Sequence, residues 1–470
     1  MERLEKGNMK QFESVDIGLL RKYSAPGPRY TSYPTAPSFT PSFGAPEYRK
    51  AIEESNRTDS NSPISLYFHF PYCDTLCYFC GCTMLVTHSR EQIREYNQYL
   101  MREVSMIAPL ISKNRKVVQL HWGGGTPSYL SPDEIKEVGS FIHDLFNYDK
   151  DIEAGVEIDP RGLTYDHMKA LREIGFNRIS MGVQDFDIRV QEAVNRIQPE
   201  SITRDAVNWS RDLGFHSINL DLIYGLPYQT LASFEKTVNT VIDIAPDRIA
   251  VFNYAHVPWL KPHQKMIHGE DLPETDLKLE IFKMTTEMLL NAGYWSVGMD
   301  HFAKQTDELA IAQRNGTLYR NFQGYSTKAG CDLYGFGMSA IGHFKETYQQ
   351  NVKNVREYYE VLKKDTLATH VGYRMTADDH NRKEVIMRIM CDMELKKSEV
   401  EKRFGIDFDG YFKESFPKLD TFVEDGLVTL HPDKIVVNGM GRLVIRNIAM
   451  CFDAYLEQMI KEKPIFSKTV

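Results

Sequence analysis

The chain has 470 residues, of which 42% are hydrophobic and 26% charged, and its formal net charge is −8. This length allows one large domain, a smaller one and a sizeable buried core. The acidic balance excludes a general binder of nucleic acids or anionic membranes, because such surfaces need an excess of positive charge.

The amino-terminal segment, residues 1–63, is expected to be an arm that leads into the main domain. Its start, MERLEKGNMKQFESVD, has no apolar run typical of a secretory signal, and nowhere do about 18 apolar residues follow one another. We therefore expect a cytoplasmic protein without a membrane or nucleic-acid partner. Residues 23–37 contain four prolines and three tyrosines, which excludes a regular helix and predicts an extended arm that lies across a site.

Residues 64–368 alternate short β-branched or aromatic runs with segments of helical period. The expected strands are residues 64–70, 116–122, 154–159, 178–183, 217–223, 248–254 and 295–300. The clearest helix is expected at residues 274–292, which end before a glycine. This alternation predicts an α/β domain, a partial or full (β/α) barrel with about six parallel strands and its chemistry at their carboxyl ends.

The alternation stops near residue 369, and residues 369–470 are expected to form a mostly helical domain with one β-like pair at residues 427–437. Helices followed by a hairpin are typical of a winged helix, a fold that often binds DNA. Residues 371–470 carry 16 Lys and Arg against 17 Asp and Glu, so the positive surface of a DNA-binding domain is missing. We expect a cap over the barrel mouth instead.

Four of the seven cysteines lie in PYCDTLCYFCGCT, residues 71–83: Cys73, Cys77, Cys80 and Cys82. An odd number of cysteines, crowded in this way, favours metal binding over disulfides. Zinc usually takes two spaced pairs of ligands, and no second pair follows. Three thiolates from one C-x3-C-x2-C loop fit a 4Fe-4S cluster better, with one iron left open for an outside ligand.

A C-x3-C-x2-C loop at the end of the first barrel strand resembles the signature of the radical S-adenosylmethionine enzymes. In that superfamily the open iron binds S-adenosylmethionine, and cleavage of this molecule gives a 5′-deoxyadenosyl radical. The resemblance implies that Phe79 lies against an adenine. It also implies that the backbone of residues 123–126, GGGT, binds the methionine end of S-adenosylmethionine.

Characteristic stretches occur along nearly the whole chain. They are GPRYTSYPTA (27–36), CDTLCYFCGC (73–82), QLHWGGGTP (119–127), GFNRISMGVQDF (175–186), NLDLIYGLP (219–227), VFNYAH (251–256), GMDHFA (298–303), RNFQGY (320–325) and IRNIAMCFD (445–453). In these stretches the chain resembles the oxygen-independent coproporphyrinogen III oxidases. The resemblance implies decarboxylation of two propionates of coproporphyrinogen III to vinyl groups, which gives protoporphyrinogen IX. It also implies two bound S-adenosylmethionine molecules.

The resemblance assigns site residues one by one. The expected cluster ligands are Cys73, Cys77 and Cys80. The expected contacts of the cluster-bound S-adenosylmethionine are Tyr67, Gly124, Glu157 and Ile341. Those of the second molecule are Phe79, Gly125, Thr126, Gln184, Arg196, Asp221 and Ala255. The residues expected at the reacting centre are Tyr67, Glu157, Phe322, Gln323 and Ile341. Carboxylates at strand ends can accept hydrogen bonds from ribose hydroxyls or an ammonium group, and Arg196 can pair with a carboxylate.

A substrate with four carboxylates implies a basic pocket despite the acidic chain. Arg29 in the arm and Arg320 are candidates for it. His301, which follows Asp300, is a candidate proton or hydrogen-bond partner, and a structural His-Asp pair is the alternative.

Other functions stay open at this point. A haem-binding chaperone of the same superfamily shares the cysteine loop, but it typically has a residue other than cysteine in place of Cys82 and lacks the YTSYPTA arm. A radical enzyme acting on another tetrapyrrole and a zinc-bearing winged-helix regulator are the remaining alternatives. We expect a monomer and a cellular electron donor whose identity the sequence does not reveal.

Overall fold

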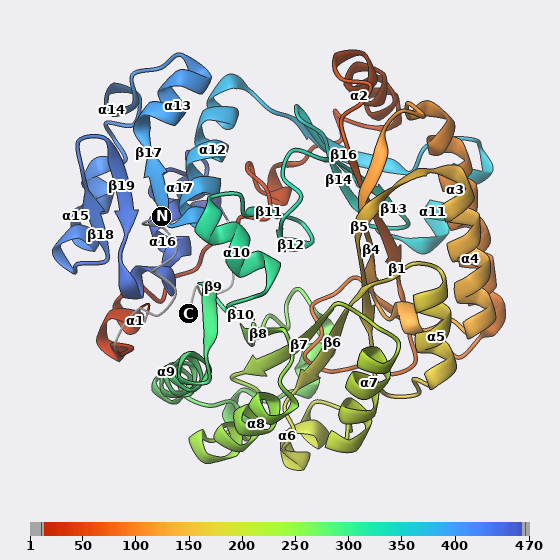
Figure 1. Ribbon diagram of the computed structural model, residues 1–470, viewed down its shortest axis with the longest axis horizontal. Coiled ribbons are helices and arrows are strands. Elements are labelled where there is room, and N and C mark those ends of the chain that lie inside the picture. Colours follow the sequence, from red (N-terminus) through yellow and green to blue (C-terminus); the bar gives the residue numbers. More distant parts are fainter. Residues whose placement is uncertain (1–10, 12–13, 463–465, 467–470) are drawn as a thin grey trace.

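One curved sheet of twelve strands organises the computed structural model, which describes residue 11, residues 14–462 and residue 466 (Figure 1). The strand order is β16-β15-β14-β13-β1-β4-β5-β6-β7-β8-β10-β9. The strands from β13 to β8 in this order are parallel to one another: β13 (Asp332–Phe336), β1 (Ile64–Phe70), β4 (Lys116–Gly124), β5 (Asn147–Ile158), β6 (Arg178–Gln184), β7 (Ser217–Tyr224) and β8 (Arg248–Asn253).

Antiparallel strands extend the sheet at both ends. They are β14 (Ile341–His343), β15 (Thr347–Asn351) and β16 (Thr369–Arg374) beyond β13, and β10 (His301–Lys304) and β9 (Tyr294–Gly298) beyond β8. Since β16 and β9 do not pair with each other, the sheet stays open and the barrel is partial.

The parallel strands β1, β4, β5, β6, β7 and β8 form where the sequence predicts them, because their apolar residues can be buried on both faces of the sheet. In β1 only the central residue, Tyr67, is partly exposed. The strand expected at residues 295–300 is β9, but it is an antiparallel edge strand, and β10 separates it from β8. Strands β13 to β16 were not expected from the sequence.

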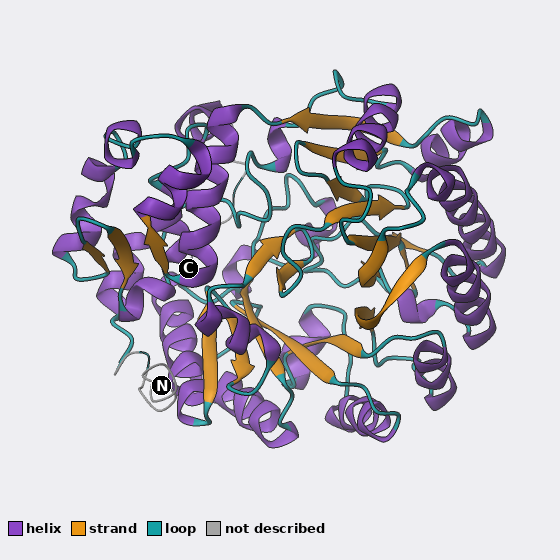
Figure 2. Ribbon diagram, turned by 45° about the horizontal axis from the view of Figure 1, so that its top comes forward, coloured by secondary structure: helices purple, strands orange, loops and turns teal. Residues whose placement is uncertain are grey.

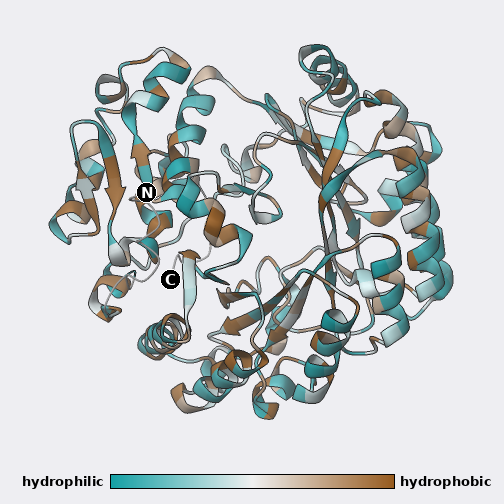
Figure 3. Cartoon of the chain, viewed as in Figure 1, coloured by the Kyte–Doolittle hydropathy of each residue, from teal (hydrophilic) through white to brown (hydrophobic). Residues whose placement is uncertain are grey.

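Helices cover the outer side of the sheet (Figure 2). They are α2 (Ala45–Thr58), α3 (Arg90–Ile107), α4 (Pro132–Leu145), α5 (Tyr165–Glu173), α6 (Ile188–Ala193), α7 (Glu200–Asp212), α8 (Leu231–Ile244), α9 (Thr275–Asn291) and α11 (Val355–Lys363). Helix α10 (Glu308–Asn315) instead lies beside β9 and β10 on the side of the carboxyl-terminal part (Figure 1). Helix α9 confirms the helix expected at residues 274–292. In α4 the buried Ile135, Val138 and Ile142 share one face, and Figure 3 shows hydrophilic residues on the outer sides of these helices.

The carboxyl-terminal part faces the open side of the curved sheet (Figure 1). Its elements are α12 (Ala377–Asp392), β17 (Glu394–Lys396), α13 (Lys397–Phe404), α14 (Phe408–Tyr411), α15 (Phe416–Glu424), β18 (Val428–Leu430), β19 (Lys434–Val437), α16 (Ile445–Met450) and α17 (Leu456–Glu462). Strands β18 and β19 are the expected pair, and β17 joins them as a third strand. The boundary expected at residue 369 coincides with the start of β16, so the central sheet continues to Arg374.

The arm lies between the barrel and the carboxyl-terminal part. After α1 (Ile17–Tyr23), the hydroxyl of Tyr30 donates a hydrogen bond of 2.9 Å to Asp453, and Ala454 N–H donates one of 3.0 Å to the hydroxyl of Tyr33. Both tyrosines are buried. The segment 1–10, on which the expectation about a secretory signal partly rests, lies outside the described residues.

Within residues 14–462 no helix has the length and apolar character needed to cross a membrane.

A buried ion pair fastens β13 beside β1. The guanidinium of Arg115, just before β4, is fully buried and lies 2.6 Å from Asp332, the first residue of β13. It also donates to the carbonyl and hydroxyl of Ser62. Removal of one partner of such a pair leaves the other charge buried and uncompensated.

We predict that Asp332→Asn lowers the free energy of unfolding by about 3 kcal/mol or more, because it leaves the Arg115 guanidinium buried without its counter-charge. Chemical denaturation measures this change. The matched control is Asp365→Asn, whose partner Arg102 is partly exposed, and which should cost less than ~1 kcal/mol. Equal effects of the two substitutions would contradict the prediction.

Candidate active site

The cysteine loop follows directly after β1. Strands β2 (Tyr72–Cys73) and β3 (Leu85–Val86) pair in parallel and close its base, so the remaining cysteines project from a short loop between them. The hydroxyl of Thr126 donates to Cys73 Sγ at 3.1 Å. Burial raises the pKa of the Cys73 thiol to about 12, and the neighbouring Cys77 and Cys80 add to this shift. All three expected ligands thus lie on one loop at the carboxyl end of β1.

Two arginines place positive charge beside Cys77. The distances from Cys77 Sγ to Arg161 Nη2 and Arg196 Nη1 are 3.4 and 3.6 Å. Both guanidinium groups pair with Asp159, at 2.7 and 3.0 Å, and Arg196 also donates to the carbonyl of Gly182. The sequence reasoning missed Asp159 and Arg161. Their signal is the DPR triplet just beyond β5, at the edge where barrel chemistry is expected.

Residues 261–264, which follow β8, form hydrogen bonds with the backbone of the cysteine loop. His263 Nε2 lies 2.7 Å from the carbonyl of Cys80, and Lys261 Nζ donates to the carbonyl of Cys82 at 2.9 Å. Gln264 donates to the carbonyl of Phe79 at 3.0 Å. Cys82 is exposed, and a hydrogen bond from its thiol lowers the pKa of Cys80.

The glycines at the end of β4 let the backbone approach the site closely. A Cβ atom on Gly123 would lie 2.9 Å from the Glu157 carboxylate, and one on Gly125 would lie 2.4 Å from the carbonyl oxygen of Pro71. Gly124 has a φ of +112°, and its N–H donates to Glu157 at 3.0 Å. Side chains at these positions would fill the space between the strand end and the cysteine loop.

Tyr67, His121 and Glu157 form a row across β1, β4 and β5. The Tyr67 ring stacks on His121 at 5.9 Å between centroids, and its hydroxyl lies 3.1 Å from His69 Nδ1. His121 Nε2 lies 3.4 Å from the Glu157 carboxylate. Burial alone would raise the pKa of Glu157, but the contacts with His121 and the Gly124 N–H lower it overall. Glu157 is therefore a charged carboxylate that can accept hydrogen bonds.

A cavity of about 220 Å³ fills the inside of the barrel and reaches this row. Asp221 on β7 lines it and accepts a hydrogen bond of 2.7 Å from Asn219. Burial raises the pKa of Asp221 to about 7, and the nearby Glu157 adds to this effect. His301 lines the same cavity, with its Nδ1 2.8 Å from the carboxylate of Asp300.

The other residues expected around a second S-adenosylmethionine lie near the carboxyl ends of the parallel strands, as the cysteine loop does. Gln184 ends β6 in a left-handed conformation, φ 68°, and its buried side-chain carbonyl has no hydrogen-bond partner among the described residues. Phe79 packs against an apolar cluster that includes Val194 and Leu226. Ala255 follows the end of β8.

The expected substrate-side residues belong to a hairpin of β11 (Tyr319–Asn321) and β12 (Gly324–Ser326) that reaches into the open side of the sheet (Figure 1). Gln323 lines the barrel cavity, and its buried Nε2 has no hydrogen-bond partner in the described residues. Phe322 packs beside Ile341 in a separate small apolar cluster built on Phe39 and Tyr348. The hairpin thus contacts the barrel cavity through Gln323 and Phe39 of the amino-terminal arm through Phe322.

The donor set of the loop fits an iron–sulfur cluster. All three expected ligands are free cysteines, and thiolates are the ligands that such clusters take. Within the described part of the chain, no group of three or more His, Cys, Asp or Glu could hold a metal ion as a single site. In a four-iron cluster each thiolate binds a different iron, so its ligands are spread more widely than those of one ion.

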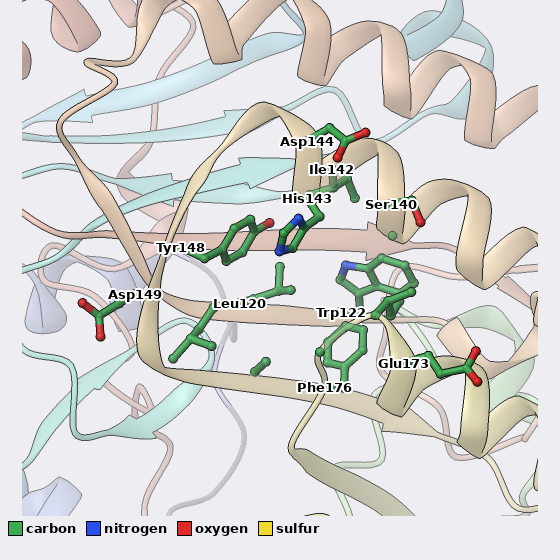
Figure 4. A pocket seen from close by; sticks show the side chains of 15 residues that line it. Leu120, Trp122, Ser140, Ile142, His143, Asp144, Tyr148, Asp149, Glu173 and Phe176 are labelled. Carbon is green, nitrogen blue, oxygen red and sulfur yellow. The ribbon is translucent and has the colours of Figure 1, made fainter.

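A larger cavity, of about 400 Å³, lies outside the barrel between α4, α5 and the sheet (Figure 4). Trp122 and Phe176 line it, and His143 stacks on Tyr148 at its side, with 4.7 Å between ring centroids. None of the expected site residues lines it.

Comparisons with known proteins identify both parts of the chain. Residues 67–241 match the Radical SAM superfamily, and residues 375–444 match the HemN C-terminal domain. The second match begins just after β16 ends.

Known proteins also match this chain over nearly its full length. The chain is 45% identical over 457 residues to the oxygen-independent coproporphyrinogen III oxidase of Pseudomonas aeruginosa, with 97% of this chain and 98% of the relative covered. It is 43% identical over 455 residues to that of Escherichia coli, with the same coverage. The solved structure of coproporphyrinogen III oxidase (HemN) from Escherichia coli, described as a radical SAM enzyme, matches with a TM-score of 0.89 and 42% identity. That match covers 95% of this chain and 100% of the other. The chain therefore belongs to the family of oxygen-independent coproporphyrinogen III oxidases, within the radical SAM superfamily.

Proposed function

We propose that this protein converts coproporphyrinogen III to protoporphyrinogen IX without oxygen, by oxidative decarboxylation of two propionate side chains to vinyl groups in haem biosynthesis. The observation that carries the proposal is the cysteine loop at the carboxyl end of β1, in a chain that matches oxidases of this name over nearly its whole length.

Cys73, Cys77 and Cys80 are proposed to hold a 4Fe-4S cluster. With S-adenosylmethionine bound, the cluster supplies a 5′-deoxyadenosyl radical that abstracts hydrogen from a propionate. The Arg161 and Arg196 guanidinium groups beside Cys77 would offset the negative charge that this ligand carries when it binds iron.

Glu157 and the glycine-rich end of β4 are proposed to orient S-adenosylmethionine. Glu157 keeps a lowered pKa inside the barrel, so it stays charged and can accept hydrogen bonds from an ammonium or a ribose hydroxyl. Tyr67 and Ile341 complete this contact surface. The backbone of Ile341 borders Gly335, which is the partner of Tyr67 in the register of β1 and β13.

A second S-adenosylmethionine is proposed at Phe79, Gly125, Thr126, Gln184, Arg196, Asp221 and Ala255. Two features support it: the unpartnered buried carbonyl of Gln184 and the carboxyl of Asp221 in the cavity. Arg196 already pairs with Asp159, so a carboxylate of the second molecule would share this guanidinium with Asp159.

Phe322 and Gln323 are proposed to contact the substrate from the hairpin, and the carboxyl-terminal part, residues 369–470, to cap the cavity. We also propose that the protein acts as a monomer in the cytoplasm and receives electrons from a cellular donor.

The activity is tested by anaerobic reconstitution with iron and sulfide, followed by incubation with coproporphyrinogen III, S-adenosylmethionine and a reductant. The expected products are protoporphyrinogen IX and two 5′-deoxyadenosines for each molecule of product. Absence of both products would refute the proposed function. Release of 5′-deoxyadenosine without vinyl product would instead indicate a relative with another substrate.

Single thiol variants test the cluster ligands. Replacement of Cys73, Cys77 or Cys80 by Ser is expected to abolish the visible absorbance of the reconstituted cluster, because each removes a direct ligand. Cys82→Ser is the matched control from the same loop and is expected to keep most of the absorbance. A cluster-free spectrum for the Cys82 variant would show that the number of ligands is wrong.

Stability against pH tests the environment of Asp221. Its pKa of about 7 exceeds the ordinary 3.8, so the folded state binds more protons than the unfolded state between these values. The wild type should lose this contribution as pH rises through about 7, whereas Asp221→Asn should not. The unfolding free energy of the variant relative to wild type is therefore expected to increase from pH 5 to pH 8.

The control for this experiment is Asp205→Asn, at an exposed position on α7. A difference between Asp221→Asn and wild type that does not change with pH would contradict the raised pKa.

A further inference from the structure

Arg320 is a buried arginine without a counter-charge at ion-pair distance. It is 3% exposed, and within the described residues no carboxylate lies within ion-pair distance of its guanidinium. Its Nε donates to the carbonyl of Arg29 at 3.0 Å, and its guanidinium lies 4.6 Å from the ring centroid of Tyr325. Its Nη1 is buried and has no hydrogen-bond partner in the described structure. A buried charge left in this state is costly, so a bound anion is the expected reason for it.

A second guanidinium lies close by but is already paired. Arg29, in the arm, donates to both carboxylate oxygens of Asp300, at 2.7 and 2.9 Å. His301, on the other side of Asp300, has a pKa lowered by burial and is neutral. The group of Arg29, Arg320, Asp300 and His301 thus contains two positive charges and one negative charge, and the buried guanidinium of Arg446 adds to its positive potential. A bound carboxylate would offset this excess of positive charge.

The position of this group points to the source of that carboxylate. Phe252, His301 and Tyr325 line the barrel cavity. Arg29 lies over the Phe252 ring at 5.2 Å, and Arg320 over the Tyr325 ring at 4.6 Å. Neither arginine lines the cavity itself, but each guanidinium lies over an aromatic ring that lines the cavity in which the tetrapyrrole is proposed to bind.

The amino-terminal arm brings Arg29 to the barrel. Arg446 of α16 donates to the carbonyl groups of Gly27 and Pro28, so the carboxyl-terminal part holds the arm in place next to Arg29. The hairpin of β11 and β12 brings Arg320, which is the central residue of β11. Gln323, at the turn of the same hairpin, already lines the cavity.

We propose that Arg320, together with Arg29, binds a propionate carboxylate of the substrate and so positions the tetrapyrrole in the cavity. This inference rests on the proposed function. Guanidinium groups stabilise a carboxylate as an anion, which opposes its loss as carbon dioxide. The anchored propionate is therefore one that does not react in that turnover, and Arg320 is a positioning residue.

Arg320→Gln and Arg320→Lys test this assignment in the reconstituted holoenzyme. Arg320→Gln is expected to raise the KM for coproporphyrinogen III at least about tenfold, and Arg320→Lys, which keeps the charge, to raise it less. The KM for S-adenosylmethionine and the cluster absorbance should not change. Arg356→Gln, an exposed arginine at the start of α11, is the control and should leave both KM values unchanged.

Thermal unfolding separates anchoring from a structural role. Since Arg320→Gln removes a buried charge that has no counter-charge, the substrate-free variant should be at least as stable as wild type. Coproporphyrinogen III should raise the unfolding temperature of wild type but much less that of the variant. A folded, cluster-loaded Arg320→Gln with an unchanged KM for coproporphyrinogen III would overturn the inference. So would a lower unfolding temperature with an unchanged KM, since it would show a structural role only.

Failure of the propionate anchor can be told apart from failure of the proposed function. If wild type forms no protoporphyrinogen IX, the function itself is wrong. If wild type forms it and Arg320→Gln does so with the same KM, only the propionate anchor is wrong.

Discussion

The placement of three thiols on one short loop at the carboxyl end of β1 is the constraint on which the rest of the structure depends. The parallel pairing of β2 and β3 closes the loop, and two arginines held by Asp159 surround Cys77. The glycines at the end of β4 keep the adjacent space free of side chains. Since parallel strands end at one edge, Glu157 near the end of β5 lies beside the glycine-rich end of β4 without any special connection.

Closure of the site comes from parts of the chain outside the parallel strands. The open sheet leaves one side of the cavity uncovered, and the hairpin of β11 and β12 approaches from that side together with the carboxyl-terminal part. The arm bridges both, through Tyr30 to Asp453 and Arg29 to Asp300. Such a site suits the proposed substrate, a large molecule with several carboxylates, because the barrel would hold the reacting centre and the added segments would supply the charges proposed to orient it.

The sequence predicted the elements whose signals are local. Strands β1 and β6 to β8 are short apolar runs between turns, and the spacing of the cysteines directly indicates a cluster ligand set. Strands β13 to β16 were missed because DLYGF and the short runs after it contain little periodicity, and their pairing with β1 is a long-range contact. The interaction of Asp159 with Arg161 and Arg196 was missed for a similar reason: its members come from the segment after β5 and the segment after α6. Arg320 was a candidate from its charge alone, but its lack of a counter-charge appears only in three dimensions.

The central claim is that three thiolates of this loop hold a four-iron cluster whose fourth iron is open to S-adenosylmethionine. Mössbauer spectroscopy of the wild-type protein reconstituted with ⁵⁷Fe, with and without S-adenosylmethionine, tests it most directly. The account predicts that one iron of the cluster changes its spectrum when S-adenosylmethionine is added, while the three irons bound by thiolates keep theirs. A spectrum that S-adenosylmethionine leaves unchanged would contradict the account.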